Sequence, residues 1–161
     1  MLGVTAIAGG MPTFSSEEAE GIEGSTVAGI LLQIASALII TLNLGDGPLR
    51  PQTWELAITA VLAPVAAALF ATAVRSRKPG LVTTGAFRFV RHPIYLAFLA
   101  MLLATGFVTH SGSKLGMAVV LYILGTELRI FNEERDLQAK FKDDYQRYCQ
   151  ATPWRYFPPL R

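Results

Sequence analysis

The chain has 161 residues, and its balance of 52% hydrophobic to 16% charged residues argues against a soluble domain. Soluble domains carry nearer ~25% charged residues, and the mean hydropathy of +0.39 agrees with this. The single cysteine, Cys149, excludes an intrachain disulfide and a cysteine-based zinc cluster. His92 and His110 are too far apart for an i,i+4 metal pair on one helix, so we expect no metal site.

The first 26 residues differ from the rest, and we expect an N-terminal tail (1–26) ahead of a membrane domain (27–161). Residues 1–11 are apolar, short and glycine-rich, and they lack the basic n-region of a signal peptide. The stretch from 15 to 24 holds four glutamates and no basic residue. This composition predicts a surface tail or a short interfacial helix that starts near Ser15.

Four apolar segments follow, and each approaches or meets the ~20 residues that cross the ~30 Å hydrocarbon core of a bilayer. Pro64 lies inside the second segment and predicts a kink, which helices in a bilayer tolerate. We therefore predict an all-α bundle of four transmembrane helices, with a basic connector before the third and a C-terminal amphipathic helix within 132–161. The predicted spans are 27–44, 54–74, 93–109 and 115–131.

The distribution of lysine and arginine predicts the orientation of this bundle. Five basic residues lie between the second and third spans and seven lie after residue 126, whereas each of the other two connections holds one. Four alternating crossings place twelve of the fourteen on one side, and the positive-inside rule makes this side cytoplasmic. We expect both termini there, in the plasma membrane of a prokaryote or the endoplasmic reticulum of a eukaryote.

An aromatic stripe follows the fourth span. Leu137, Phe141, Tyr145 and Tyr148 are spaced by 4, 4 and 3 residues, which places them on one face of a helix. The other face is charged, so we expect an amphipathic segment at the membrane surface or packed on the spans, ending before Pro153. This spacing favours packing over a ligand-binding role for the stripe.

Ionisable and aromatic residues gather at the predicted cytoplasmic ends of the third and fourth spans. His92 and Tyr95 share the first turn of the third span, and Arg129 and Glu133 share a face of the fourth. An ion pair between Arg129 and Glu133, with the arginine reaching the headgroups, explains the second pair without any function. The short connection between the two spans nevertheless brings all four side chains to one end, and such convergence is typical of a ligand site.

Two sequence blocks carry a family resemblance. The first, at 82–95, reads Val-Thr-Thr-Gly-Ala-Phe-Arg-Phe-Val-Arg-His-Pro-Ile-Tyr, and the second, at 133–148, has the pattern Glu-Glu-x-x-Leu-x-x-x-Phe-x-x-x-Tyr-x-x-Tyr. Together they resemble the isoprenylcysteine carboxyl methyltransferase family and, loosely, related membrane methyltransferases that act on phospholipids. The resemblance covers about residues 72–158. It implies an S-adenosylmethionine pocket between the last hairpin, the basic connector and the C-terminal segment.

The resemblance also implies residue roles, by position. It implies an acceptor-side role for Arg129 and cofactor contacts at Leu81, Val82, Phe87, His92, Pro93, Ile94, Tyr95 and Glu133. The chain departs from the family pattern at Phe87, which is usually a tyrosine, and at Ala97, which is usually a glycine. The late Arg-Val-Pro of the family reads Ala-Thr-Pro here. These departures affect the identity of the acceptor more than the use of the cofactor.

The resemblance implies an integral membrane enzyme that transfers a methyl group from S-adenosylmethionine to a lipophilic small molecule or lipidated acceptor, first of all at a carboxylate. A phospholipid amine or a thiol is the alternative acceptor, and Glu133 or Glu134 is then the available proton acceptor. A non-catalytic membrane protein that binds lipids or partners is the alternative of another class. Membrane lipids are expected partners and nucleic acid is not, while the sequence leaves the oligomeric state open.

Overall fold

The computed structural model describes residues 16–43, 51–108 and 112–156, and its side chains are described within 24–42, 51–108 and 112–156. These ranges contain helices and turns and no strand, so the predicted all-α fold is confirmed. The elements, in chain order, are α1 (Ser16–Asn43), α2 (Thr53–Arg75), the short 3-10 helix η1 (Gly85–Arg88), α3 (Pro93–Val108) and α4 (Gly112–Ala151).

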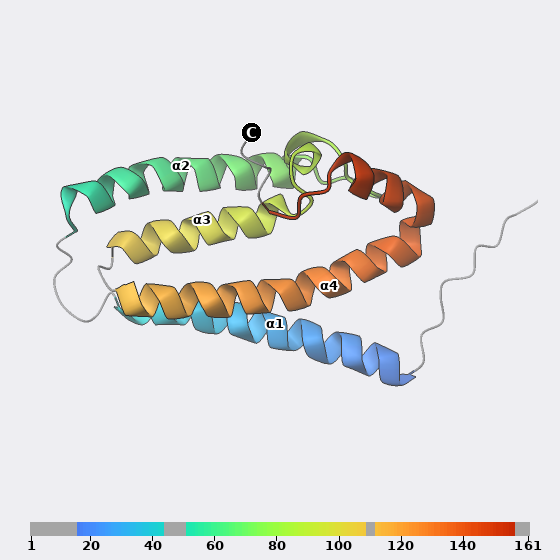
Figure 1. Ribbon diagram of the computed structural model, residues 1–161, viewed down its shortest axis with the longest axis horizontal. Helices are drawn as coiled ribbons and strands as arrows, with labels where there is room; N and C mark the ends of the chain where they lie inside the picture. Colours follow the sequence, from blue (N-terminus) through green and yellow to red (C-terminus); the bar gives the residue numbers. More distant parts are fainter. Residues whose placement is uncertain (1–15, 44–50, 109–111, 157–161) are drawn as a thin grey trace, which may run out of the picture.

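The four long helices form two pairs. α1 packs along α4 and α2 packs along α3, and α3 and α4 provide most of the contact between the pairs (Figure 1). The end of α2, the connector that contains η1, the start of α3 and the last turns of α4 gather at one end of the bundle (Figure 1). The described segments that are predicted to face the cytoplasm therefore lie close to one another.

Three of the helices are long and apolar enough to cross a membrane: the stretch Gly24–Leu42 of α1, α2, and α4. The fourth, α3, is apolar but has 16 residues, which corresponds to a length of ~24 Å at 1.5 Å per residue. It lies beside the longer α2 (Figure 1). The chain is thus an integral membrane bundle of four helices, with one shorter than the others.

Two helices are longer than the spans predicted from the sequence. α1 begins at Ser16, so the acidic stretch and the first span form one continuous helix. α4 continues for 40 residues to Ala151, through the amphipathic segment, and is interrupted only by the non-helical backbone of Lys142 at φ 45°. At this break the chain turns back toward the connector (Figure 1), so the amphipathic segment covers the end of the bundle.

Small residues form much of the helix packing, while large apolar side chains face outward. Ala73 and Ala118 are fully buried, whereas Val61 is 63% exposed and Phe131 is 65% exposed. Small residues between helices let the backbones approach closely, and lipid surrounds the large outward side chains as favourably as a protein core would. This distribution is that of a membrane bundle.

Candidate active site

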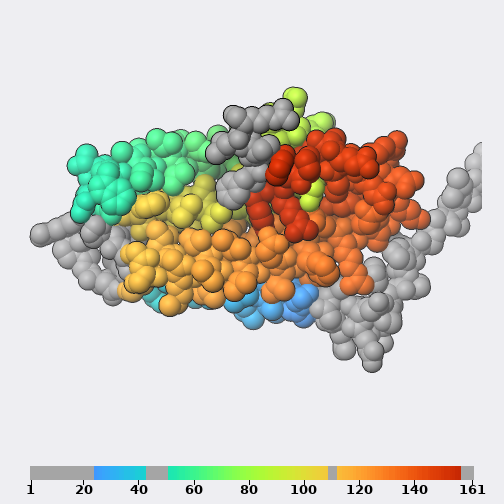
Figure 2. All heavy atoms as spheres, viewed as in Figure 1, coloured from blue at the N-terminus to red at the C-terminus, as the bar shows by residue number. Residues whose placement is uncertain are grey.

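The C-terminal segment (residues 152–156) is bound to the connector by backbone hydrogen bonds. The Arg91 N–H donates to the carbonyl of Trp154 at 2.8 Å, and the His92 N–H donates to the carbonyl of Arg155 at 3.1 Å. Figure 2 shows the red C-terminal part of the chain lying against the yellow-green connector. The C-terminal segment therefore holds the residues just before α3 in place, next to the predicted site residues.

Four ionisable side chains form an ionic cluster where this segment meets the connector and α4: Arg91, His92, Glu134 and Arg155. One carboxylate oxygen of Glu134 lies 3.0 Å from Arg91 and 3.2 Å from His92 Nε2, and the other lies 2.6 Å from Arg155. Burial alone would raise the pKa of Glu134, but the hydrogen bonds from His92 and Arg155 and the charge of Arg91 outweigh it and lower the pKa to about 2. Glu134 is therefore ionised and fully engaged, and it is unsuited to accept a proton from a substrate.

Glu133 lies in a more open position than Glu134. Its side chain is 47% exposed, and its carboxylate accepts a hydrogen bond from the Tyr95 hydroxyl at 3.2 Å and lies 3.7 Å from His92 Nδ1. The structure thus brings together His92, Tyr95 and Glu133, three of the residues singled out in the sequence. Of the two adjacent carboxylates, Glu133 is the one that faces free space.

That space is a polar cleft made of two adjoining cavities of about 430 Å³ and about 260 Å³. The residues that line both cavities are Arg77, Gly80, Glu133 and Leu137. Most of the cofactor contacts implied by the resemblance line the cleft, namely Leu81, Val82, Phe87, His92, Tyr95 and Glu133. Pro93, which is fully buried, and Ile94 are the two that line neither cavity in the described part of the chain.

Arg129 lines the larger of the two cavities of the polar cleft. Its guanidinium carbon is 5.3 Å from the centre of the Tyr95 ring, and its Nη1 donates a hydrogen bond of 2.8 Å to Gln33 Oε1. The guanidinium is thus held by Gln33 and Tyr95, while Glu133 faces Tyr95 and His92. The pairing of Arg129 with Glu133, one of the interpretations open from the sequence, is replaced by a contact with α1.

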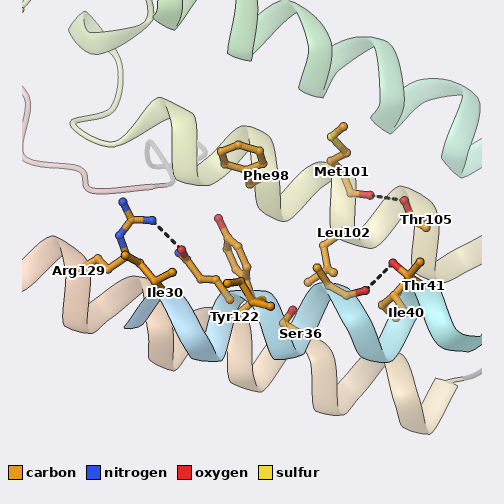
Figure 3. A pocket seen from close by; sticks show the side chains of 13 residues that line it. Ile30, Ser36, Ile40, Thr41, Phe98, Met101, Leu102, Thr105, Tyr122 and Arg129 are labelled. Atoms are coloured by element: carbon orange, nitrogen blue, oxygen red, sulfur yellow. Dashed lines mark hydrogen bonds between the residues drawn. The ribbon is translucent and has the colours of Figure 1, made fainter. Parts of the chain in front are cut away.

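The same arginine also lines a second, apolar cavity of about 410 Å³ between α1, α3 and α4 (Figure 3). Its walls carry Ile30, Ile34, Phe98, Met101 and Leu102, among others. Among the described residues, Arg129 is the one that lines both the polar cleft and the apolar cavity. A polar compartment and an apolar compartment therefore meet at one cation.

Two contributions to this site were missed in the sequence. Gln33 was treated only as part of an uncharged span, although a lone amide within a membrane helix is itself a signal. Glu134 and Arg155 were not recognised as partners, because their pairing depends on the chain turning back after Lys142. Within the described ranges, no group of three or more His, Cys, Asp or Glu side chains could hold a metal ion.

Comparison with known proteins agrees with this architecture. Residues 55–144, more than half of the chain, match the model of the phospholipid methyltransferase family. The chain is also 36% identical over 81 residues to methanethiol S-methyltransferase 1 of Bradyrhizobium diazoefficiens, a match that covers 48% of this chain and 27% of that protein. The chain thus matches only about a quarter of the length of this relative. The resemblance found in the sequence is confirmed, and the chain belongs to the phospholipid methyltransferase family of membrane methyltransferases.

Proposed function

We propose that the chain transfers a methyl group from S-adenosylmethionine to the carboxylate of a lipophilic acceptor held within the membrane. The observation that carries this proposal is the place of Arg129, which lines both the polar cleft and the apolar cavity. A polar methyl donor and an apolar acceptor need separate compartments that meet where the methyl group is transferred. Family membership supports the reaction class.

The polar cleft fits S-adenosylmethionine in size and in chemistry. Each of its cavities is near or within the ~300–1,000 Å³ of small-molecule sites. Glu133 and Asp136 supply negative charge to face a cationic sulfonium and an ammonium group. The apolar part of the lining suits the face of a purine, and the basic part suits a carboxylate. The apolar part consists of Leu81, Val82 and Phe87, and the basic part consists of Arg77 and Lys78.

When bound, S-adenosylmethionine supplies an activated methyl group on its sulfonium. A carboxylate acceptor needs no general base, so the protein chiefly has to hold the acceptor close and aligned. Arg129 does this through its planar fork, which binds a carboxylate with two charge-assisted hydrogen bonds. The Tyr95 ring lies over the guanidinium carbon at 5.3 Å and supports the fork from that side, and the apolar cavity takes the lipophilic part of the acceptor.

Thiol methylation is the second candidate, because the similar protein from Bradyrhizobium is named for a thiol acceptor. Glu133 is then the available proton acceptor, since Glu134 is ionised and fully paired. The cavity of about 410 Å³ favours a larger acceptor than methanethiol, because a molecule the size of water occupies only ~30 Å³. A long-chain thiol therefore suits this cavity better than methanethiol, which has only two non-hydrogen atoms.

Transfer of a radiolabelled methyl group tests these proposals. Purified protein in phosphatidylethanolamine vesicles is given labelled S-adenosylmethionine with S-farnesyl-N-acetylcysteine, dodecanethiol or no added acceptor. We expect label in the farnesylated carboxylate, released as methanol by mild base. Base-stable label in dodecanethiol would select the thiol reaction, and label in the vesicle lipid would select the phospholipid amine. The absence of label from all three, with folded protein, would support the non-catalytic alternative.

We further propose that the polar cleft faces the cytoplasm. Cysteines introduced at Gln52 and Gly112, in a Cys149→Ser background, would then be labelled from the side opposite to cysteines at Gly80 and Gln150. Labelling of all four positions from one side would contradict four crossings.

A further inference from the structure

Gln33 is a neutral polar residue in the middle of the apolar part of α1, and α1 lies outside residues 55–144 that match the family. Both ends of its amide are hydrogen-bonded to α4. The oxygen accepts from Arg129 at 2.8 Å, and the nitrogen donates to the Thr126 hydroxyl at 2.8 Å. Polar side chains within a bilayer are costly and tend to have a function, so this long-range contact calls for an explanation.

A close approach of the two helices brings Gln33 within reach of Arg129. A Cβ atom added to Gly29 would lie 2.7 Å from the carbonyl of Gly125 and 2.7 Å from Arg129 Cγ, and one added to Gly125 would lie 2.6 Å from the carbonyl of Gly29. Gly29 is one helical turn before Gln33, so the arginine stem crosses the helix at Gly29 and its head reaches the amide. Because Gly29 and Gly125 have no side chains, the two helices approach closely and the Arg129 side chain can cross α1 to reach Gln33.

The guanidinium is left with most of its donors available. Arginine has five N–H donors, and in the described structure one hydrogen bond from Arg129 is seen, the one to Gln33. The Tyr95 ring contacts the guanidinium as well. Gln33 therefore fixes the head without neutralising it, because an amide carries no charge. A glutamate in this place would hold the head and cancel its charge.

We propose that Gln33 is a positioning residue, through which α1 holds the Arg129 fork in the orientation that binds the acceptor carboxylate. This inference rests on the proposed function, because it assigns to Gln33 an effect on the acceptor and none on the methyl donor. It extends the active site beyond the part of the chain that matches the family. The simpler alternative is that Gln33 and Thr126 only attach α1 to α4, as polar pairs do in membrane bundles.

Gln33→Met is the main test, because methionine keeps the length of the side chain and removes both hydrogen bonds. We expect kcat/KM for S-farnesyl-N-acetylcysteine to fall at least tenfold, and the Kd of the same probe, measured without methyl donor, to rise by a similar factor. The Kd of S-adenosylmethionine should change less than twofold. Leu31→Met, on the exposed side of the same helix, is the matched control and should match wild type in all three quantities.

Gln33→Glu separates positioning from helix attachment. A carboxylate still accepts from Arg129, so the fork stays in place, but its charge opposes that of the acceptor. We expect an unchanged kcat and a KM for the farnesylated carboxylate that rises at least fivefold. A helix-attachment role alone predicts no difference between the charged probe and dodecanethiol, so an equal change for both probes would count against the proposal.

A double-substitution cycle shows whether Gln33 acts through Arg129. If it does, Gln33→Met should lower kcat/KM less than twofold in an Arg129→Lys background, although it lowers it tenfold or more in wild type. Fully additive losses would overturn the inference, as would a Gln33→Met protein that binds and methylates the probe as wild type does. If the wild-type protein neither binds nor methylates the probe, the proposed carboxylate function is contradicted, and so is the inference that rests on it.

Discussion

The two compartments that meet at Arg129 are built in opposite ways. Around the polar cleft, the connector, the start of α3, α4 and the C-terminal segment are joined by ion pairs and hydrogen bonds, with Glu134 bound to three side chains. Around the apolar cavity, α1, α3 and α4 present mostly apolar side chains, and the hydrogen bonds from Arg129 to Gln33 and from Gln33 to Thr126 join two of its walls. Arg129 lines both compartments.

Under the proposed function, this difference separates the binding of the methyl donor from the binding of the acceptor. S-adenosylmethionine is a fixed, highly polar ligand, and a site held in place by charged contacts is preorganised for it. A lipophilic acceptor is recognised mostly by apolar area, which needs volume more than precise directions. We therefore expect substitutions near the cleft to affect cofactor binding and folding, and substitutions near the cavity to affect the acceptor.

The largest expected effect follows from removing the charge at the centre of the ionic cluster. Glu134→Gln keeps the shape of the side chain but leaves Arg91 and Arg155 without their shared carboxylate. We expect a loss of about 2–3 kcal/mol in the free energy of unfolding, between the values for exposed and for buried pairs, measured by thermal unfolding in detergent. Glu127→Gln, which removes the more exposed partner of Arg155, is the control and should cost less than about 1 kcal/mol. Equal effects of the two substitutions would show that the ionic cluster stabilises the fold no more than an exposed ion pair does.

The same carboxylate predicts how stability depends on pH. Folding lowers the pKa of Glu134 from 4.5 to about 2, so its ionised form stabilises the folded state. This stabilisation is complete above about pH 4.5 and is lost as the pH falls from there toward 2. The difference in thermal midpoint between wild type and Glu134→Gln should therefore shrink over this interval. A difference that stays constant would show that the charge of Glu134 is not what stabilises the fold.

Two substitutions in the polar cleft test whether its residues bind S-adenosylmethionine. His92→Ala and Glu133→Ala remove polar groups that line the cleft and contact each other. We expect each to weaken S-adenosylmethionine binding at least tenfold, or about 1.4 kcal/mol, by calorimetric titration in detergent. Folded variants with wild-type affinity would take these residues out of the cofactor site.

Arg129→Lys tests the boundary between the two compartments. Lysine keeps the positive charge but lacks the planar fork, so it is not equivalent at a site that binds a carboxylate through two hydrogen bonds. We expect methyl transfer to the farnesylated probe to fall about tenfold, or about 1.4 kcal/mol of transition-state stabilisation, while cofactor affinity stays within about twofold. Both quantities are measured on one purified sample. Unchanged turnover with unchanged affinity would leave Arg129 with a structural role only.

The smallest expected effect lies in the wall of the apolar cavity. The Ser36 hydroxyl is fully buried and has no hydrogen-bond partner among the described residues. A buried hydroxyl without a partner costs about 1–3 kcal/mol, so Ser36→Ala should stabilise the protein by up to about 1 kcal/mol in thermal unfolding. Thr105→Val, which loses a hydroxyl bonded to the Met101 carbonyl, should give no such gain. Destabilisation by Ser36→Ala would mean that the cavity wall needs this hydroxyl.

The sequence predicted the local parts of this arrangement. His92, Tyr95 and Glu133 lie within short motifs at the ends of spans, so the number of crossings was enough to bring them to one end. The apolar segments likewise predicted the helices, because length and hydrophobicity decide which segments cross a bilayer. The start of α1 at Ser16 agrees with the short helix that was one alternative for the tail, but the polar first turns gave no sign that this helix continues into the first span.

The parts that were not predicted depend on contacts between distant segments. The ionic cluster forms because the chain turns back at Lys142, a non-glycine residue with a positive φ that no local pattern indicates. The contact of Gln33 with Arg129 depends on how closely α1 and α4 approach each other at Gly29. Spacing within one helix predicted a partner for Arg129 at Glu133, and helix packing supplied a different one.

Ultraviolet crosslinking of S-adenosylmethionine, labelled in its methyl group, tests most directly whether the cleft binds the methyl donor. Peptide mapping of the irradiated wild-type protein would locate the label, with an excess of S-adenosylhomocysteine as competitor. We expect label that is competed away in 77–95 and in 129–141, the two stretches that supply most of the cleft lining. Competed label confined to 30–41 or 98–105, which line the apolar cavity, or no competed label at all, would contradict the division of the two compartments.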